Sequence, residues 1–481
     1  MNVLLVRTPF PEMCLGFKGL AELEPLHLEY LAANLEDHNV SIFDTWIHGE
    51  KKLLDEIATK KWDVIGFNSS AVHILKVHEY SRFAKSINSN ILIMVGGEQP
   101  TISPGMYNIP EIDIIIFGEG ITKISKIIEA YKNKNSFETI PGIAYRKNGE
   151  LLFTQRDSGL SCFNKYKLPN RELLKKERKK YFFYGVRSIA TVVYSLGCPY
   201  KCNFCCVWRK QIGVQTRDPQ LIINELKDIK EEWVFFCDDN YFANINIDEF
   251  LDLLEKSNIK KKYIIEASSE LIIKKESLLS RFRDLGLRTV LIGLESFDKD
   301  DLNMVNKVAS VEQNIAALEL LRKYDVDCLA SAIVYPHWTK KNFDNLWHNI
   351  KKQKITYLHL QCLTAYPGTE LFEECFDQIT SFHTDTYDME HMLLKTKLPI
   401  KDFYREIAKI YIKTYNPIRL ITLHRNLPFP LNPFHKSTYT MFKFIYGVLN
   451  AHKHSKKKCV FDEFKSIEEF TLSKINTHKI Y

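Results

Sequence analysis

The stretch S-L-G-C-P-Y-K-C-N-F-C-C, which runs from Ser195 to Cys206, carries three cysteines at the spacing C-x3-C-x2-C. These are Cys198, Cys202 and Cys205, and each supplies a soft thiolate of the kind that binds iron–sulfur clusters or zinc. A structural zinc site needs a fourth Cys or His, and Cys206 is adjacent in sequence, where side chains rarely converge on one small ion. Three thiolates in a tight loop can instead hold three irons of a cubane cluster and leave the fourth iron open for chemistry. A zinc knuckle or three unrelated cysteines are the alternatives.

The cysteine loop stands at the start of a long alternation of strands and helices. Ile189–Ser195 is rich in β-branched and aromatic residues, which predicts the first strand. Five further strands are predicted between helical segments, at Trp233–Cys237, Tyr263–Ser268, Val290–Leu294, Cys328–Val334 and Tyr357–Gln361. Six such units over residues 189–400 predict a (β/α)6 partial TIM barrel, whose chemistry lies at the carboxyl ends of the strands.

Residues 1–135 alternate in the same way and predict an α/β domain of their own. Their strands, for example 63–69 and 91–97, are almost wholly apolar, which indicates a parallel sheet covered on both faces, as in Rossmann-like domains. Ligands bind beyond the carboxyl ends of such strands. Small and polar residues gather at these ends, namely Ser69, Ser70, Gly96, Gly97, Pro100, Thr101, Gly118, Glu119 and Gly120. We predict a ligand site there; the alternative is that the glycines only make turns.

Residues 136–188 are predicted to connect the two domains. Ile140–Phe153 predicts a β-hairpin with an Asn-Gly turn. Lys165–Lys180 is a run of charges, which we interpret as a solvated linker or helix face in preference to a nucleic-acid contact.

Residues 401–481 are predicted to form an α-helical C-terminal region. No Asp or Glu occurs between Asn416 and Phe461, where basic residues stand among aromatic ones. A basic amphipathic helix within 417–461 is compatible with peripheral contact to an anionic membrane. A helix packed over the active site is the equal alternative.

Composition sets the broad class. The chain has 481 residues and a net charge of +7, which alone is weak support for a nucleic-acid partner, and we expect none. The chain contains 11 cysteines, and this odd number favours a protein of the reducing cytoplasm over one held by a disulfide framework. No signal peptide and no membrane-spanning stretch is expected.

Several motifs together resemble one enzyme family. C-N-F-C-C-V-W-R, F-F-C-D-D-N-Y-F, L-I-G-L-E-S and A-Y-P-G-T-E-L-F-E-E, with G-G-E-Q-P-T and F-G-E-G upstream, resemble the cobalamin-dependent radical S-adenosylmethionine (SAM) enzymes, and among them the hopanoid C-3 methylase branch. The resemblance covers residues 1 to about 415. It implies a [4Fe–4S] cluster on the three cysteines, SAM on the open iron and cobalamin in the N-terminal domain.

The resemblance also suggests roles for particular residues. Phe204 packs beside the cluster and SAM, Asp238 meets the SAM amino group, and Ser269 and Glu295 approach its ribose and carboxylate. The glycine-rich strand ends of the first domain surround the corrin. The family's Arg-Ser-Asp after the third strand is Ser-Ser-Glu here, which puts the contact at Ser269 in doubt. The acid pair that includes Asp238 and Asp239 would alternatively suit Mg²⁺.

A D-x-H-x-x-G motif, which would supply a histidine below the cobalt, is absent from the sequence. By resemblance, cobalamin is expected with its own base detached and no histidine below it. We interpret His27, His38 and His73 as surface or core residues.

The implied function is C-methylation of an unactivated carbon in a lipid-like or natural-product substrate, by a 5′-deoxyadenosyl radical and methylcobalamin. An external electron donor such as flavodoxin or ferredoxin is expected. The alternatives are a cyclase or rearrangement enzyme without methyl transfer, and a non-catalytic cobalamin- or cluster-binding protein. No proton-transfer residue is assigned; Cys206, Cys237, Tyr335 and Tyr366 are candidates for lining the cavity.

Overall fold

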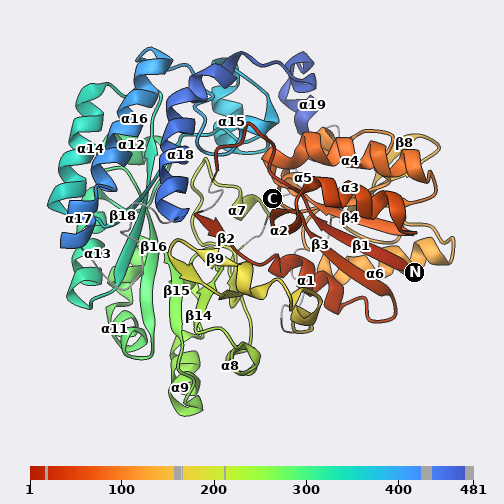
Figure 1. The fold of residues 1–481 in the computed structure, drawn as a ribbon, viewed down its shortest axis with the longest axis horizontal. Coiled ribbons are helices and arrows are strands. Elements are labelled where there is room, and N and C mark those ends of the chain that lie inside the picture. The colour runs from red at the N-terminus through yellow and green to blue at the C-terminus, as the bar shows by residue number, and fades with distance from the viewer. Residues whose placement is uncertain (17–19, 157–163, 165, 211–212, 424–435, 472–481) are drawn as a thin grey trace.

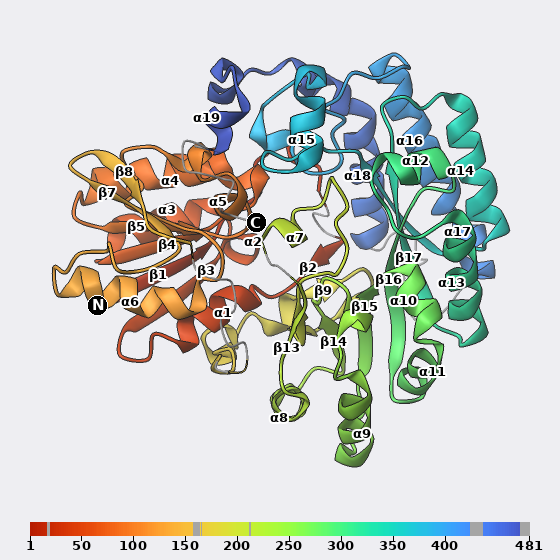
Figure 2. The same ribbon diagram turned by 180° about the vertical axis from the view of Figure 1, so that it is seen from behind.

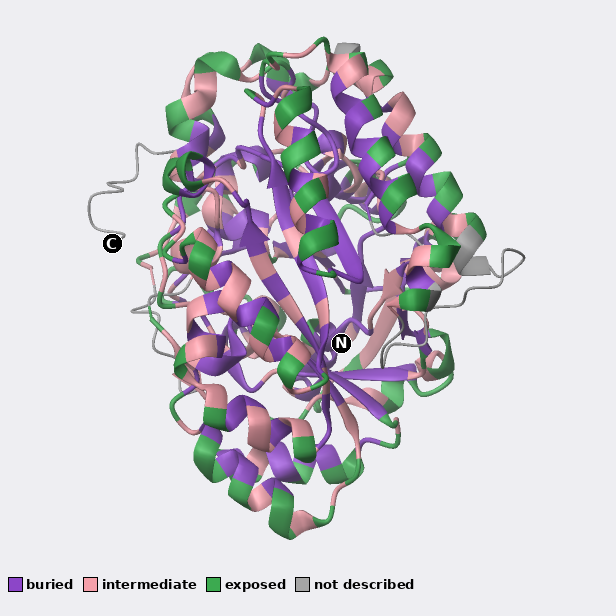
Figure 3. Ribbon diagram, turned by 90° about the vertical axis from the view of Figure 1, so that its left-hand side faces the viewer, coloured by how far each residue is buried: buried purple, intermediate pink, exposed green. Residues whose placement is uncertain are grey.

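The computed structural model describes residues 1–16, 20–156, 164, 166–210, 213–423 and 436–471. Its centre is a pair of β-sheets that lie side by side, each flanked by helices (Figures 1 and 2). The strands are buried in the interior, and exposed residues gather on the outer faces of the helices (Figure 3).

The first sheet has the strand order β3-β1-β4-β5-β6-β7-β8 within the described residues. Its strands are β1 (Asn2–Arg7), β3 (Asn39–Asp44), β4 (Val64–Asn68), β5 (Leu92–Gly96), β6 (Ile114–Ile116), β7 (Ile143–Lys147) and β8 (Glu150–Phe153). The strands from β3 to β6 are parallel, as predicted. The predicted hairpin is β7–β8, and it pairs antiparallel with β6. It extends this sheet and covers the edge of β6, so it is part of the first domain's sheet and not only of the connector.

Alternation along the strands of the first sheet separates two apolar layers. Val3 and Leu5 of β1 face α1 (Leu26–Ala33) and α6 (Ile121–Lys132). Leu4 and Val6 point to the opposite side, where α3 (Glu50–Thr59) and α4 (Ile74–Ile87) pack. Both faces of the sheet are therefore covered, which explains why its strands are almost wholly apolar.

The second sheet is an open barrel of parallel strands in sequential order, β11-β14-β15-β16-β17-β18, in the part of the chain that the structure describes. The strands are β11 (Ile189–Val192), β14 (Trp233–Phe236), β15 (Lys262–Ala267), β16 (Leu287–Glu295), β17 (Asp327–Val334) and β18 (Tyr357–Cys362). The intervening helices include α8 (Pro219–Asp228), α9 (Ile247–Ser257), α11 (Glu276–Asp284), α13 (Val311–Lys323) and α14 (Lys340–Lys352). The predicted (β/α)6 partial barrel is confirmed.

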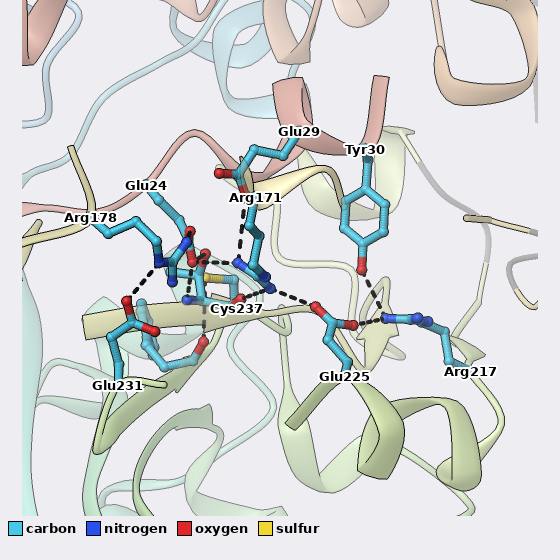
Figure 4. A network of polar contacts seen from close by, with 11 residues as sticks. Glu24, Glu29, Tyr30, Arg171, Arg178, Arg217, Glu225, Glu231 and Cys237 are labelled. Atoms are coloured by element: carbon cyan, nitrogen blue, oxygen red, sulfur yellow. Dashed lines mark hydrogen bonds and ion pairs between the residues drawn. The ribbon is translucent and has the colours of Figure 1, made fainter. Parts of the chain in front are cut away.

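The charge run in the connector has a structural role that the sequence did not reveal. Arg171 contacts Glu24 of the first domain at 2.7 Å and Glu225 of the barrel at 2.6 Å (Figure 4). Arg178 likewise bridges Glu24 at 2.5 Å and Glu231 at 2.6 Å. The interpretation of this run as solvated is therefore wrong for the two arginines, because each is held between carboxylates of the two domains.

The C-terminal region is helical within the described residues, as predicted. Its main helices are α16 (Ile400–Thr414), α18 (Lys436–Asn450) and α19 (Ile467–Thr471). α16 lies between α14 and α18 on the outside of the barrel (Figure 1). α19 reaches back to the 3-10 turn Pro104–Tyr107 of the first domain, where Phe470 is fully buried. Residues 424–435, which the expected membrane-contact segment includes, lie outside the described residues.

Candidate active site

The three cysteines of the C-x3-C-x2-C loop line one cavity of about 470 Å³ at the carboxyl ends of the barrel strands. Phe204 lines the same cavity; its packing beside the cluster and SAM stays a prediction. The loop is held from outside by Asn203, whose amide donates to the carbonyl of Met304 at 3.0 Å. The donor set therefore suits a cluster with one open iron, because three thiols face one chamber large enough for a second ligand.

The protonation of the thiols is governed by burial. Burial raises the pKa of Cys202 to about 11 and that of Cys205 to about 12. Metal binding by these thiols must therefore release protons, and assembly is expected to depend on pH. Among the described residues, no three His, Cys, Asp or Glu side chains converge on a single metal ion. A cluster needs no such convergence, since its cysteines bind different irons.

Asp238 is fully buried and is not among the residues that line the cavity, so its contact with the SAM amino group stays a prediction. Its carboxylate accepts hydrogen bonds from the backbone N–H groups of Tyr194 at 2.8 Å and Ser195 at 2.7 Å, and from the Ser195 hydroxyl at 2.6 Å. Burial nevertheless raises the pKa of Asp238 to about 7. Its role is to fix the turn into the cysteine loop. The neighbouring Asp239 and Asn240 line the cavity in its place.

Ser269 is also turned away from the cavity. Its hydroxyl donates to the amide oxygen of Asn314 at 2.6 Å, and Ser268 lines the cavity instead. Glu295 does line the cavity, and its carboxylate pairs with Lys307 at 2.9 Å; its contact with SAM stays a prediction. The backbone of Glu295 has φ +58°, and the register between β16 and β17 shifts at this point. A strained backbone at a cavity wall is typical of functional sites.

The barrel interior contains polar groups that sequence reasoning missed. Glu266, Ser331, His359 and Gln361 line the cavity below the cysteines. Strand pairing sets Glu266 beside Leu291 in one layer and Ser331 beside His359 in the next. The signal that could have found them is the alternation of polar with apolar residues along these strands.

The His359 ring is held by a buried carboxyl group. Its Nε2 lies 2.7 Å from an oxygen of Glu390, and the amide of Gln361 lies 3.2 Å from its Nδ1. Burial lowers the pKa of His359 to about 3 and raises that of Glu390 well above its usual range. Burial also raises the pKa of Glu266 to about 8. These groups are therefore neutral near pH 7 and can exchange hydrogen bonds with a ligand without charge.

A second cavity, of about 220 Å³, lies at the carboxyl ends of the first sheet. The residues of the two glycine-containing loops that we predicted at these strand ends all line it, namely Gly96, Gly97, Gly118, Glu119 and Gly120. The rest of its wall is mainly apolar, with Leu28, Leu31, Met94 and Ile124 among the lining residues. An apolar slot under a glycine-rich rim suits a flat heterocyclic group such as a detached cobalamin base. His27, which the sequence interpretation placed at the surface or in the core, is exposed and lines the mouth of this cavity.

Gly97 is needed at this rim for a steric reason. A Cβ atom there would stand 2.6 Å from the carbonyl oxygen of Ser69, and its φ is +124°. Thr101 joins the two glycine loops, since its hydroxyl donates to the Gly97 carbonyl at 2.6 Å and accepts from the Gly118 N–H at 3.1 Å. Glu119 caps the start of α6 through Thr122 at 3.1 Å. The rim is thus a rigid, preformed surface.

Of the other predicted residues of the first domain, one lines a cavity and two are buried behind a cavity wall. Ser70 lines a third cavity, of about 520 Å³. Ser69 is buried behind it, and its hydroxyl accepts from Tyr107 at 2.7 Å. Pro100 is buried within α5 (Glu98–Ile102) and supports the rim from below.

The third cavity lies where the two domains meet. Ser70 and Glu98 of the first domain and Cys205 and Cys206 of the cysteine loop all contribute to its wall. The Cys206 thiol donates to Glu98 at 2.7 Å, and Glu98 pairs with Lys210 at 3.1 Å. Of the other candidates, Tyr366 lines this cavity, whereas Cys237 and Tyr335 are not among the lining residues described for any of the three cavities.

The cysteine-loop cavity and the third cavity thus share part of their walls. Phe204, Cys205 and Gln361 line the first and third cavities alike. A ligand on the cysteine loop can therefore lie next to a molecule held in the third cavity, between the two domains.

Comparison with protein families matches residues 192–348 to the radical SAM superfamily and residues 15–127 to the B12 binding domain. The chain is 26% identical over 407 residues to the hopanoid C-3 methylase of Methylococcus capsulatus, covering 83% of this chain and 78% of that protein. It is 26% identical to the anaerobic magnesium-protoporphyrin IX monomethyl ester cyclase of Rubrivivax gelatinosus, covering 72% and 64%.

Among solved structures, the fold resembles the cobalamin-dependent S-adenosylmethionine radical enzyme OxsB with aqua-cobalamin and S-adenosylmethionine bound. The TM-score is 0.66 at 17% identity, covering 95% of this chain and 76% of that one. Both halves of the chain thus have a known fold.

Proposed function

Because the chain belongs to the cobalamin-dependent radical SAM enzymes near the hopanoid methylases, we propose that it transfers a methyl group from SAM to an unactivated carbon of a lipid-like or natural-product substrate. The observation that carries this proposal is the shared wall of the cysteine-loop cavity and the inter-domain cavity. When bound, the cluster would supply an electron that makes SAM a source of radicals, and cobalamin would carry the methyl group.

The chain's own residues position these groups and exclude water. Cys198, Cys202 and Cys205 would hold the cluster, and Asp239 and Asn240, which line the same cavity, would be available to contact a ligand bound beside it. The rim around Gly97 would hold cobalamin. The walls of the inter-domain cavity include apolar side chains such as Phe10, Trp46 and Tyr366, which suit an apolar substrate.

The partners follow from this chemistry. An external one-electron donor such as flavodoxin or ferredoxin would reduce the cluster. A lipid-like substrate would reach the enzyme from a membrane, so peripheral membrane contact through residues 417–461 is part of the proposal. No helix in the described residues combines the length and the apolar character needed to cross a bilayer.

The test is an anaerobic incubation of the reconstituted protein with cobalamin, a strong reductant and SAM that carries a deuterated methyl group, with and without cell lipid extract. We expect 5′-deoxyadenosine, S-adenosylhomocysteine and a labelled lipid, and none of these from the Cys202→Ala variant. Deoxyadenosine with an unlabelled, altered product would favour a cyclase, which the similarity to the magnesium-protoporphyrin cyclase makes the second candidate. Neither nucleoside product, from protein with a full cluster, would contradict an enzymatic function.

A further inference from the structure

The helix α18 is apolar on two opposite sides. Its inner side packs on the core through Met441, Phe444, Ile445 and Val448, which are all buried. Its outer side carries Tyr439, Phe442 and Tyr446, which are 69%, 65% and 68% exposed. The spacing of these three residues, i, i+3 and i+7, places them on one stripe of the helix. The core accounts for the inner side but not for the aromatic stripe.

Two further large apolar side chains are exposed on the C-terminal helices. Ile412 of α16, the helix that packs on α18, is 55% exposed, and Ile418 of α17 (Pro417–Thr422) is 74% exposed. Large exposed apolar side chains are ordinary when they are scattered singly, but a group of them on neighbouring helices marks an interaction surface. Figure 1 shows that α16 and α18 lie together on the outside of the barrel.

The charge around the stripe is positive. Lys443 is exposed next to Phe442, and Lys453, Lys457 and Lys458 are exposed after the end of the helix. The sequence between Asn416 and Phe461 contains no Asp or Glu. The acids at the start of α16 are neutralised within the helix, where Asp402 pairs with Arg405 at 2.8 Å and Glu406 with Lys409 at 2.8 Å.

We propose that the outer stripe of α18 docks this protein on an anionic membrane surface. Tyrosine rings suit the headgroup layer, where one end of the ring is apolar and the other wet, and a phenylalanine between them can enter the acyl boundary. Lysines on the same surface add attraction to anionic lipids. The helix would lie in the plane of the membrane. This inference rests on the membrane contact of the proposed function and deepens it, because it names the side chains and the lipid charge; docking itself needs neither cluster nor cobalamin.

A second copy of the chain fits this surface less well. In a two-fold contact the same patch faces itself, so Lys443 would lie near its own counterpart and the surrounding lysines would repel one another. An anionic surface instead complements both the aromatic stripe and the lysines. The charge of the patch therefore selects a membrane as the occupant.

The test is co-sedimentation of the full-length protein with vesicles of phosphatidylcholine alone or with phosphatidylglycerol added. We expect binding to the anionic vesicles and binding at least about tenfold weaker to the neutral ones. The double variant Phe442→Ser/Tyr446→Ser should lose about tenfold or more on anionic vesicles. Lys443→Glu should lose about fivefold, and on anionic vesicles only.

A matched control removes exposed apolar side chains elsewhere. Ile87 and Ile245 are 47% and 82% exposed on other parts of the molecule, and the variant Ile87→Ser/Ile245→Ser should bind like the wild type. The proposal is overturned if the wild type does not bind anionic vesicles, or if the α18 variant binds as tightly as the wild type. A dimer that dissociates in the α18 variant, without vesicle binding, would assign the surface to a second copy and would equally overturn it. Neither result bears on methyl transfer, which is assayed separately.

Discussion

Arg171 is the residue whose removal should most weaken the junction between the two domains. Its guanidinium lies 2.7 Å from Glu24, 2.6 Å from Glu225 and 2.7 Å from the carbonyl oxygen of Thr191, and only 15% of its side chain is exposed. Arg171→Met keeps the length of the side chain but leaves two buried carboxylates without this cation. Breaking a buried ion pair from one side destabilises a protein by about 3–5 kcal/mol when the remaining charge is uncompensated. Glu24 keeps Arg178 and Glu225 keeps Arg217 as partners, so the loss here is expected to lie below that range.

The assay is urea unfolding of the full chain, followed by tryptophan fluorescence, with the variant and the wild type in the same redox state. We expect the first unfolding transition of Arg171→Met to move to clearly lower urea. A second substitution tests the reason: Arg171→Met/Glu24→Gln should be more stable than Arg171→Met alone, because Glu24 no longer carries a charge that has lost a cation, while Arg178 keeps Glu231 as its partner. The exposed Lys175, which pairs with Glu172 at 2.8 Å, provides the control, and Lys175→Met should not shift the transition.

Two results would refute this reasoning. If Arg171→Met unfolds at the same urea concentration as the wild type, the contacts in Figure 4 contribute no net stability. If the double variant is less stable than the single one, the loss does not arise from an uncompensated carboxylate.

Three other predictions concern the same framework. Burial raises the pKa of Glu29 to about 8, so the free energy of unfolding of the wild type should fall as the pH rises from about 4.5 to about 8. The Glu29→Gln variant should become increasingly more stable than the wild type across this range in unfolding measurements. A difference in stability that does not change with pH would contradict the pKa shift. Gly97→Ala should weaken aquocobalamin binding by about tenfold or more in a spectral titration, because its Cβ would meet the Ser69 carbonyl at 2.6 Å; Gly149→Ala, which meets no atom within 4 Å, should not. Cys202→Ala should lose cluster iron in an iron assay and keep cobalamin binding, since the two cavities are lined by different residues; unchanged iron would refute its assignment as a ligand.

The parts of the fold that follow from local chemistry could be predicted from the sequence. Continuous apolar strands between helices indicated parallel sheets, and both sheets are parallel over the predicted strands. The cysteine spacing indicated one chamber, and the three thiols share it. These features depend on patterns within short stretches, where side-chain periodicity and turn residues determine the structure.

At two strand ends, the residues that line the cavity are direct neighbours of the predicted ones: Asp239 and Asn240 follow Asp238, and Ser268 precedes Ser269. The strands have already ended at these points, β14 at Phe236 and β15 at Ala267, so the alternation of an extended strand does not determine which side chain faces the cavity. The family motif gives the stretch but not the conformation of the turn after each strand, so the residue that lines the cavity could not be chosen from the sequence.

The connector shows a different limit. Arg171 and Arg178 look like members of a solvated charge run, because the sequence around them is polar. Their partners are far away in sequence, at Glu24 and Glu225, and contacts of this kind depend on how the domains assemble. Local composition therefore cannot distinguish a run of solvated charges from a run whose arginines form ion pairs between the two domains.

The assembly of the two halves converges on α5, the short helix that follows Gly97. At its start, Glu98 holds the Cys206 thiol next to the cysteine loop. In its middle, the amide of Gln99 donates to the carbonyl of Pro367 in the barrel at 3.1 Å, and Thr101 joins the two glycine loops. The short helix α5 thus contacts the glycine-rich rim of the first domain, the cysteine loop, and the loop that follows the last barrel strand, β18. A displacement of the glycine-rich rim is therefore expected to reach the cysteine loop through the contact between Glu98 and Cys206.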